Sequence, residues 1–457
     1  MNTLAAFRTA FEARKVPASL RGRVAPIDAA YEAFLDYASR GDVAIYGANT
    51  LLGHRDTEFR LQSAETEEYF LRNHAIGGPP FLSGEEVAAI TLAKLFSLYQ
   101  DGVTLSGRVF QAIIDCFEDR QFHVLVPEEA SYSSGDVIPA SHWAIGVLER
   151  AGLLHDLRPG EAIGLMNGAF VHVGLTALFY IKARALLSRV VTVQLNSLQA
   201  LRVSRWKISG HTIDDEGPMA DFQRAFLSHL SDQDAATRQL PVSIRSTFEQ
   251  IASFRRTLMR LGDELALQIA QPSGNPLFSK TLNRHFSSGS FVAPALAIQT
   301  SAVIDALLML AWSSVERTKF LLSGPVPEMP VDAATEHDVL GMIQWPKLAQ
   351  AKLEAIRHRF GSRAFVSGGT TSYGVEDFWT HGSYTSLSAL KLLDNISEIF
   401  AIELSSGLRI SQISAYPNTE ILAFFGGRTE TAGFDDVMRR WEQLDRLDLG
   451  VTLGLNE

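Results

Sequence analysis

The stretch ALAIQTSAVIDALLMLAWSSVERTKFLL, residues 295–322, is apolar in its middle on nearly every face of a helix. A helix of that kind lies inside a bundle or at a contact between subunits. Apolar residues recur at three- and four-residue spacing in other long segments, which favours helix there too. We predict long helices over 141–154, 162–200, 244–270, 294–322, 346–359 and 385–414. Several long helices with little strand predict a mainly α fold, built as an elongated helical bundle.

The first hundred residues are predicted to hold shorter elements. Residues 1–40 have a helical pattern, and a strand-like run, DVAIYGAN, follows at 42–49. A helix then begins near residue 82, where Ser83 is a good N-cap and Glu85 and Glu86 lie in the first turn. Acidic side chains are favourable there because the helix dipole is positive at its N-terminus.

Three polar stretches are predicted to be loops between the helices. One is PEEASYSSGDVIP at 127–139, and the others span 207–222 and 323–338. Serine, glycine and proline are typical of turns, so a Ser-Ser-Gly-Asp string by itself predicts only a turn or a helix cap.

Composition restricts the partners of the chain. Of its 457 residues, 46% are hydrophobic and 20% are charged, which is typical of a globular protein with a large core. The net charge is −10 and the basic residues are scattered, whereas nucleic acids and anionic lipids bind basic patches. We expect a small-molecule ligand, no nucleic-acid partner and no membrane partner.

The cysteine content and the apolar segments favour the cytoplasm. Cys116 is the single cysteine and lies in an apolar stretch, so we expect a buried thiol and no disulfide within the chain. The most apolar segment, 163–186, is interrupted by Asn167 and His172. A membrane span needs about 20 apolar residues with few interruptions, so this segment is predicted to be a buried helix.

Several motifs, in the same order along the chain, resemble the histidine, phenylalanine and tyrosine ammonia-lyase family. SSGDVIPASH (133–142) resembles the family segment that begins Ala-Ser-Gly-Asp. The other matching segments are IYGANTLLG (45–53), RNHAIGG (72–78), EAIGLMNGA (161–169), QLPVSIRS (239–246), SGNPLF (273–278), SSGSFVAP (287–294) and TTSYGVEDFWTHG (370–382). Each match is weak alone, but eight matches in register identify the chain as a divergent member.

The resemblance implies a catalytic group made from the chain itself. In the family this tripeptide cyclises without an external cofactor into 4-methylidene-imidazole-5-one (MIO), an electrophile. Here Ser133, Ser134 and Gly135 match the tripeptide, and Asp136 matches the residue that assists ring formation. Glycine allows the tight backbone that ring closure needs. Phe291 matches the phenylalanine that packs against the strained loop.

The resemblance also implies roles in substrate binding and proton transfer. Tyr46 matches the catalytic base that takes the β-proton, and we expect its pKa to be lowered by hydrogen bonding or positive charge. Arg245 matches the arginine that binds the substrate carboxylate, a task that suits a guanidinium fork. Asn167 matches the asparagine that holds the ring or the substrate. His74 and Glu376 match residues that contact a polar substrate ring, imidazole or phenol.

The family architecture is implied in the same way. We expect residues 1–190 to form a smaller N-terminal domain that carries the catalytic tyrosine and the tripeptide. Residues 191–457 are expected to form the long-helix bundle and the C-terminal helices. In the family, sites form at the junction of several subunits, so a homotetramer is expected.

Departures from the pattern cluster around the expected site. Val242 replaces a tyrosine whose hydroxyl lies beside MIO in the family, and Val375 and Phe378 replace polar residues. Tyr132 stands where the family has a small residue, and is a candidate to replace the missing hydroxyl. These changes predict a drier pocket and a specialised amino acid substrate.

Three functions agree with these residues. The first is an ammonia-lyase acting on an aromatic or imidazole-type L-amino acid. The second is an aminomutase, which returns ammonia to the β-carbon. The third is a divergent relative that lacks MIO, either with different chemistry or as a non-catalytic binding protein. Because Tyr46, Ser134, Asn167 and Arg245 are all present, an enzyme is favoured over a binding protein.

Overall fold

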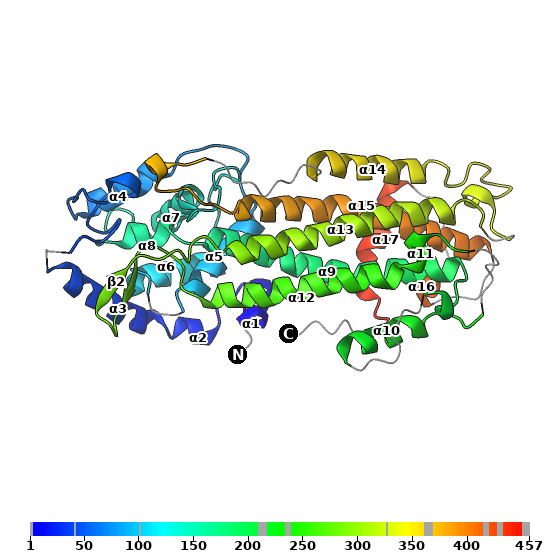
Figure 1. The fold of residues 1–457 in the computed structure, drawn as a ribbon, viewed down its shortest axis with the longest axis horizontal. Helices are drawn as coiled ribbons and strands as arrows, with labels where there is room; N and C mark the ends of the chain where they lie inside the picture. Colours follow the sequence, from blue (N-terminus) through cyan, green and yellow to red (C-terminus); the bar gives the residue numbers. More distant parts are fainter. Residues whose placement is uncertain are drawn as a thin grey trace.

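The computed structural model describes residues 3–40, 43–99, 102–208, 217–233, 239–325, 328–360, 369–414, 420–426 and 433–449. In this part of the chain the secondary structure is helical except for one short hairpin. The molecule is elongated, and its long helices run side by side along its longest axis (Figure 1). The predicted mainly α, elongated bundle is confirmed.

Four long helices form the central bundle, and a fifth packs on its outside. They are α9 (Phe170–Ala200), α12 (Thr247–Ala270), α13 (Pro294–Leu321), α15 (Gly382–Ile413) and, outside, α14 (Trp345–Phe360). A fully buried ion pair joins α13 to α15, with Arg317 Nε 2.6 Å from Glu403 Oε1. Ser197 of α9 donates a hydrogen bond to the same oxygen at 2.7 Å. Three helices therefore share one satisfied polar contact in an apolar core.

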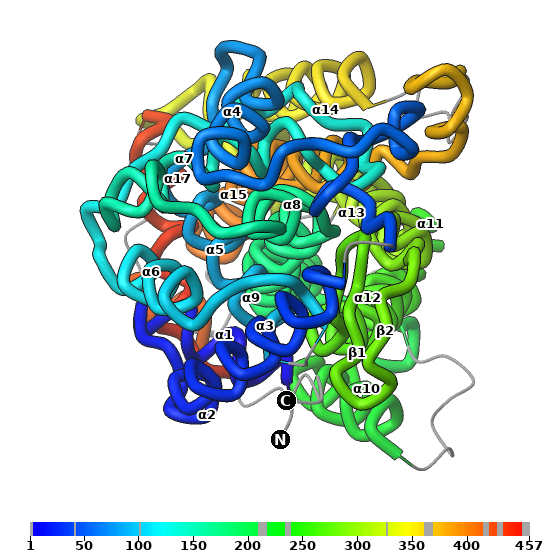
Figure 2. The backbone as a smooth tube through the Cα atoms, turned by 90° about the vertical axis from the view of Figure 1, so that its left-hand side faces the viewer, coloured from blue at the N-terminus to red at the C-terminus, as the bar shows by residue number. Residues whose placement is uncertain are grey.

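The helices before α9 gather at one end of the bundle, which Figure 2 views end-on. Ser83 caps α5 through a reciprocal pair of hydrogen bonds with Glu86, which confirms the predicted start of this helix. Cys116 is buried in α6, as predicted. These helices are α1 (Thr3–Ala13), α2 (Ala18–Arg21), α3 (Val24–Ala38), α4 (Ala64–His74), α5 (Gly84–Ser97), α6 (Gly107–Glu118), α7 (Val137–Ala151) and α8 (Glu161–Met166).

Shorter elements complete the described structure. Strands β1 (Leu277–Ser279) and β2 (Arg284–Phe286) form an antiparallel hairpin in which Leu277 pairs with Phe286. The short helices are α10 (Pro218–Ser228), α11 (Val242–Arg245), α16 (Glu420–Phe424) and α17 (Phe434–Gln443). The 3₁₀ turns are η1 (Gly53–Arg55), η2 (Arg205–Lys207), η4 (Val331–Ala333), η5 (Ser372–Gly374) and η6 (Leu444–Arg446).

Two sequence predictions were wrong at the end of the bundle that holds helices α1 to α8. The strand-like run at 42–49 is a loop in its described part, 43–49. Asn49 accepts a hydrogen bond from the Ile45 N–H at 2.7 Å and donates to the Val43 carbonyl at 2.8 Å, so its side chain takes backbone groups that a strand would need. The helix predicted over 162–200 is interrupted between α8 and α9, because Gly168 has a φ of +145°.

Other boundaries differ less. The loop predicted at 207–222 falls partly outside the described residues, and α10 begins within it at Pro218. The hairpin of β1 and β2 was not predicted. The expected division at residue 190 falls within α9, which continues to Ala200.

Two segments, Glu161–Ala200 and Pro294–Leu321, are long and apolar enough to cross a membrane by those criteria alone. The apolar window of the first is wholly buried inside the protein, and that of the second is about half buried. Core helices of large bundles pass the same test, so these segments are weak evidence for a membrane span.

Candidate active site

The loop Ser133–Asp136 enters α7 through an unusual backbone. Ser133, Gly135 and Asp136 have φ values of +62°, +86° and +48°, in the left-handed region. That region disfavours residues with a Cβ, so surrounding contacts must hold Ser133 and Asp136 there. Both are buried, with 1% and 2% of their surface exposed. Ser134, between Ser133 and Gly135, is half-buried. It is the residue of the tripeptide that a small molecule can reach.

Hydrogen bonds converge on the Asp136 carboxylate. Its Oδ1 accepts from the hydroxyls of Ser131 and Ser383, the latter at 2.9 Å. Its Oδ2 accepts from the backbone N–H of His172 at 3.2 Å. Burial raises the pKa of Asp136, although these donors oppose the shift. The side chain is therefore a fixed buried carboxyl group, directly after the tripeptide.

Asn167 lies against Gly135 at the break between α8 and α9. A Cβ added to Gly135 would come within 3.3 Å of Asn167 Nδ2, so the backbone approaches this amide closely. The Gly168 N–H donates to the Gly135 carbonyl at 3.2 Å. Among the described residues the buried Oδ1 of Asn167 has no hydrogen-bond partner. A buried acceptor without a donor is costly, and the N–H of a substrate amine would satisfy it.

Tyr46 belongs to the loop before η1 and is largely buried. Its hydroxyl accepts a hydrogen bond from the Gly53 N–H at 3.0 Å. Burial raises the pKa of Tyr46, the Gly53 bond lowers it, and the charges of Glu376 and Asp56 raise it further. Our expectation of a lowered pKa was therefore wrong for the isolated chain, because burial outweighs the one hydrogen bond.

Glu376 lies close to the tripeptide through Tyr132. The Tyr132 hydroxyl donates to Glu376 Oε2 at 2.5 Å, and Thr371 donates to the same oxygen at 2.6 Å. Burial, and then the bond to Glu376, raise the pKa of Tyr132 to about 12, so its hydroxyl stays a neutral donor. The Tyr132 ring also packs 4.6 Å from that of Trp379. Tyr132 thus fastens the 371–381 segment to the loop.

His74 and Phe291 lie at the edges of this region. His74 ends α4, and its Nδ1 lies 2.7 Å from the Phe70 carbonyl, which leaves Nε2 for another partner. Phe291 is half-buried in the turn before α13. The next carbonyl, that of Val292, accepts from Thr380 at 3.2 Å, so this turn lies beside the segment that enters α15.

Arg245 lies far from the other candidates within one chain. It ends α11, immediately before α12 begins at Thr247. Ser273 lies just beyond the other end of α12, and its hydroxyl accepts a hydrogen bond from the N–H of Ala169, two residues from Asn167, at 3.2 Å. The 24 residues of α12 therefore separate Arg245 from the loop, which is about 36 Å at 1.5 Å per residue. Figure 1 places α11 and α7 at opposite ends.

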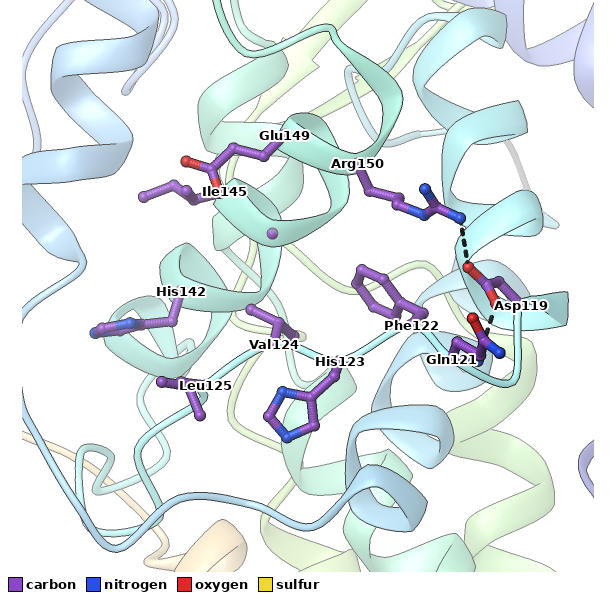
Figure 3. Close-up of a pocket in the computed structure, with 11 residues that line it drawn as sticks. Asp119, Gln121, Phe122, His123, Val124, Leu125, His142, Ile145, Glu149 and Arg150 are labelled. Atoms are coloured by element: carbon purple, nitrogen blue, oxygen red, sulfur yellow. Dashed lines mark hydrogen bonds and ion pairs between the residues drawn. The ribbon is translucent and has the colours of Figure 1, made fainter.

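A cavity of about 690 Å³ lies beside α7, away from the tripeptide. Figure 3 shows His123 and His142 on one side and the ion pair of Asp119 and Arg150 on the other. His142 Nε2 lies 3.0 Å from the Ile76 carbonyl, so this histidine has a partner within the protein. The cavity lining contains none of the predicted catalytic residues.

The structure adds residues that sequence reasoning missed. Ser131, Thr371 and Ser383 bind the loop or Glu376, and each lies within or directly beside a matching motif. Their positions next to those motifs were the available signal. Serine and threonine are so common in turns that residue type alone did not single them out.

Comparison with known proteins identifies the family of the chain. The family model described as aromatic amino acid lyase matches residues 3–430. A probable histidine ammonia-lyase of Thermoplasma volcanium is 23% identical over 432 residues, covering 87% of this chain and 85% of its own length. A tyrosine ammonia-lyase of Cupriavidus metallidurans is also 23% identical, covering 90% and 86%.

Solved structures share the fold at lower identity. Phenylalanine aminomutase of Pantoea agglomerans has a TM-score of 0.83 at 17% identity, covering 99% of this chain and 98% of its own. The ergothioneine-degrading enzyme ergothionase of Treponema denticola has a TM-score of 0.83 at 16% identity, covering 97% and 98%. Since the family model spans nearly the whole chain, the protein belongs to the aromatic amino acid lyase family and is an enzyme, an ammonia-lyase or a related aminomutase.

Proposed function

We propose that the protein is a MIO-dependent ammonia-lyase that eliminates ammonia from an aromatic or imidazole-type L-amino acid. The observation that carries the proposal is the loop Ser133–Asp136, which is held in a left-handed bend with only Ser134 accessible. MIO formed from Ser133, Ser134 and Gly135 would supply an electrophile for the substrate amine. Gly135 and the unpaired Oδ1 of Asn167 fit such a group and its amine.

Tyr46 is proposed to remove the β-proton. It must be ionised to act as a base, but burial and the negative charge of Glu376 both disfavour the ionised form. Positive charge near the hydroxyl would oppose these two effects. We propose that a neighbouring copy of the chain supplies it when the site is complete.

Arg245 is proposed to bind the substrate carboxylate from another subunit. Because α12 separates it from the loop of its own chain, it can serve only a loop at the far end of a second chain. This geometry supports a homotetramer in which each site combines residues of several copies. We also propose that the enzyme is soluble and cytoplasmic.

The substrate ring is proposed to be polar. Glu376 Oε2 is already occupied by Tyr132 and Thr371, which leaves Oε1 to accept one hydrogen bond. His74 Nε2 is a second polar group for the ring. An imidazole or phenol offers one matching donor, whereas a phenyl ring offers none.

Intact-mass measurement and product analysis test this function. The purified chain should be lighter than its sequence by two water molecules, and it should release ammonia from L-histidine, L-tyrosine or a related amino acid, giving an unsaturated acid. An unmodified chain that is nevertheless active would refute the MIO mechanism. A modified chain that releases no ammonia from any aromatic or imidazole amino acid would refute the substrate class.

The aminomutase reaction is the second candidate. It needs the same base, carboxylate site and amine site, so the residues described above serve both reactions. Chromatography of the products separates the two: a β-amino acid identifies a mutase, and an unsaturated acid with free ammonia identifies a lyase.

A further inference from the structure

The hydroxyl of Ser133 caps the N-terminus of α15. Its Oγ accepts from the Ser383 N–H at 2.8 Å and donates to the Ser383 hydroxyl at 3.1 Å. The first N–H groups of a helix have no partner within the helix, and His381, at the N-cap, provides no side-chain cap here. The first residue of the tripeptide is therefore tied to α15 through its side chain.

Ser383 also binds the carboxylate of Asp136. Its hydroxyl donates to Asp136 Oδ1 at 2.9 Å, and Ser131 donates to the same oxygen. The Ser131 hydroxyl in turn accepts from the Ser133 N–H at 2.9 Å. The four side chains and the Ser133 N–H form a closed ring of hydrogen bonds. Ser133, Asp136 and Ser383 are all buried.

We propose that Ser383 is a positioning residue for closure of the Ser133–Gly135 loop into MIO. It holds Ser133 in its left-handed conformation and links the Ser133 hydroxyl to Asp136. The inference rests on the proposed function. It also gives the serine at position 133, where an alanine would carry no hydroxyl, a defined partner in this chain.

The closure balances without any other reactant. The Gly135 nitrogen bonds to the carbonyl carbon of Ser133, and that carbonyl oxygen leaves as water with the amide hydrogens of Gly135 and Ser134. Ser134 loses its hydroxyl and its α-hydrogen as a second water. No electrons are gained or lost overall. Asp136, directly after Gly135, takes up and returns the protons, and Ser383 keeps it aligned with Ser133.

The test follows the mass of newly made protein with time. Wild type, Ser383→Ala and the matched control Ser386→Ala are expressed in pulses, and the fraction lighter by two waters is measured after denaturation. Ser386 is one turn further along α15, is buried, and binds Thr176 and the Gly382 carbonyl without touching the loop. Thermal denaturation and oligomeric state are measured for each variant.

Ser383→Ala removes both hydrogen bonds of the Ser383 hydroxyl, with Ser133 Oγ and with Asp136 Oδ1, and is expected to slow loop closure about tenfold. Ser386→Ala is expected to close at the wild-type rate, and Ser383→Thr, which keeps a hydroxyl, to recover most of the rate. If Ser383→Ala does not fold, Ser131→Ala is used in its place. Ser131 is half-buried and donates to the same Asp136 carboxylate.

The outcomes separate the two proposals. Closure of a folded Ser383→Ala or Ser131→Ala chain at the wild-type rate overturns this inference and leaves the proposed function standing. Equal slowing by Ser386→Ala also overturns it, because the effect would then be general to α15. A wild-type chain that never loses water overturns both.

Discussion

The candidate residues at the two ends of the bundle differ in burial. At the loop end, Ser133 and Asp136 are buried, and Ser383 of the same chain binds both of them. At the α11 end, Val242 is 65% exposed and lines an open cavity of about 660 Å³ with Trp312 of α13. Residues of a single chain therefore hold the loop, whereas the α11 end, with Arg245, is left open.

An apolar stripe on α13 indicates that the open end lacks a second subunit. Ile298, Met309 and Trp312 are exposed and, at spacings of eleven and three residues, lie on one face of the helix. The other faces of α13 pack on α12, α14 and α15. The exposed Asp305 lies on the same face between Ile298 and Met309, so the stripe carries one charge. Exposed apolar side chains grouped on one helix face are typical of a subunit contact. We therefore expect MIO formation to be a property of one chain and catalysis to be a property of the assembly.

The largest expected effect comes from Ser134→Ala. This change removes the hydroxyl that must leave as water, so the chain should keep its full mass and lose activity by about a thousandfold or more. Intact mass and ammonia release check both parts. The oligomer should be unchanged in size-exclusion chromatography, because Ser134 lies in the loop and not on the α13 stripe. Retained activity would contradict the assigned chemistry.

Trp312→Glu should affect the α11 end and leave the loop end unchanged. A charge at this end of the stripe, beside the open cavity, should dissociate the assembly and lower activity by about a hundredfold or more. The chain should still lose two waters, because its loop is complete without a partner. Val339→Glu is the control, since this apolar residue is even more exposed but lies in the turn before α14. An assembled and fully active Trp312→Glu protein would disprove the role of the stripe.

Arg245→Ala should act on substrate binding alone. Loss of a two-pronged contact to a carboxylate should raise KM about a hundredfold, with the loss of two waters and the assembly unaffected. Arg245→Lys should recover only part of the loss, because an ammonium cannot reproduce the guanidinium fork. Steady-state kinetics and intact mass measure these effects. An unchanged KM would remove the assigned role.

The smallest expected effect is a shift in the pH profile of Glu376→Gln. The carboxylate raises the pKa of Tyr46, and Tyr46 must be ionised to act as a base. Removing the negative charge lowers that pKa, so the rise of kcat/KM with pH should move to lower pH. Asp56→Asn should move it in the same direction without touching the substrate ring, since Asp56 has the same sign of effect. No shift in either variant would argue against Tyr46 as the base.

Motif order predicted most of the candidate site, because residues in register with a family tend to occupy the same places in its fold. Tyr46, Asp136, Asn167 and Glu376 come together at one end as the resemblance implied, through contacts that link separate motifs. Their roles remain predictions. The pKa of Tyr46 in the isolated chain differs from the expectation, because burial depends on neighbours that a pattern in the sequence does not contain.

Periodicity in the sequence by itself determined the long helices, since a helix forms through contacts between residues three and four positions apart. The tripeptide and its glycine were assigned from the resemblance of the sequence motifs to the family, because ring closure depends on residue type. Only the tertiary structure decided that Ser383, 250 positions along, binds Ser133, and that α12 keeps Arg245 away from the loop of its own chain. These are contacts and distances between distant segments, which follow from how whole helices pack and not from any local pattern.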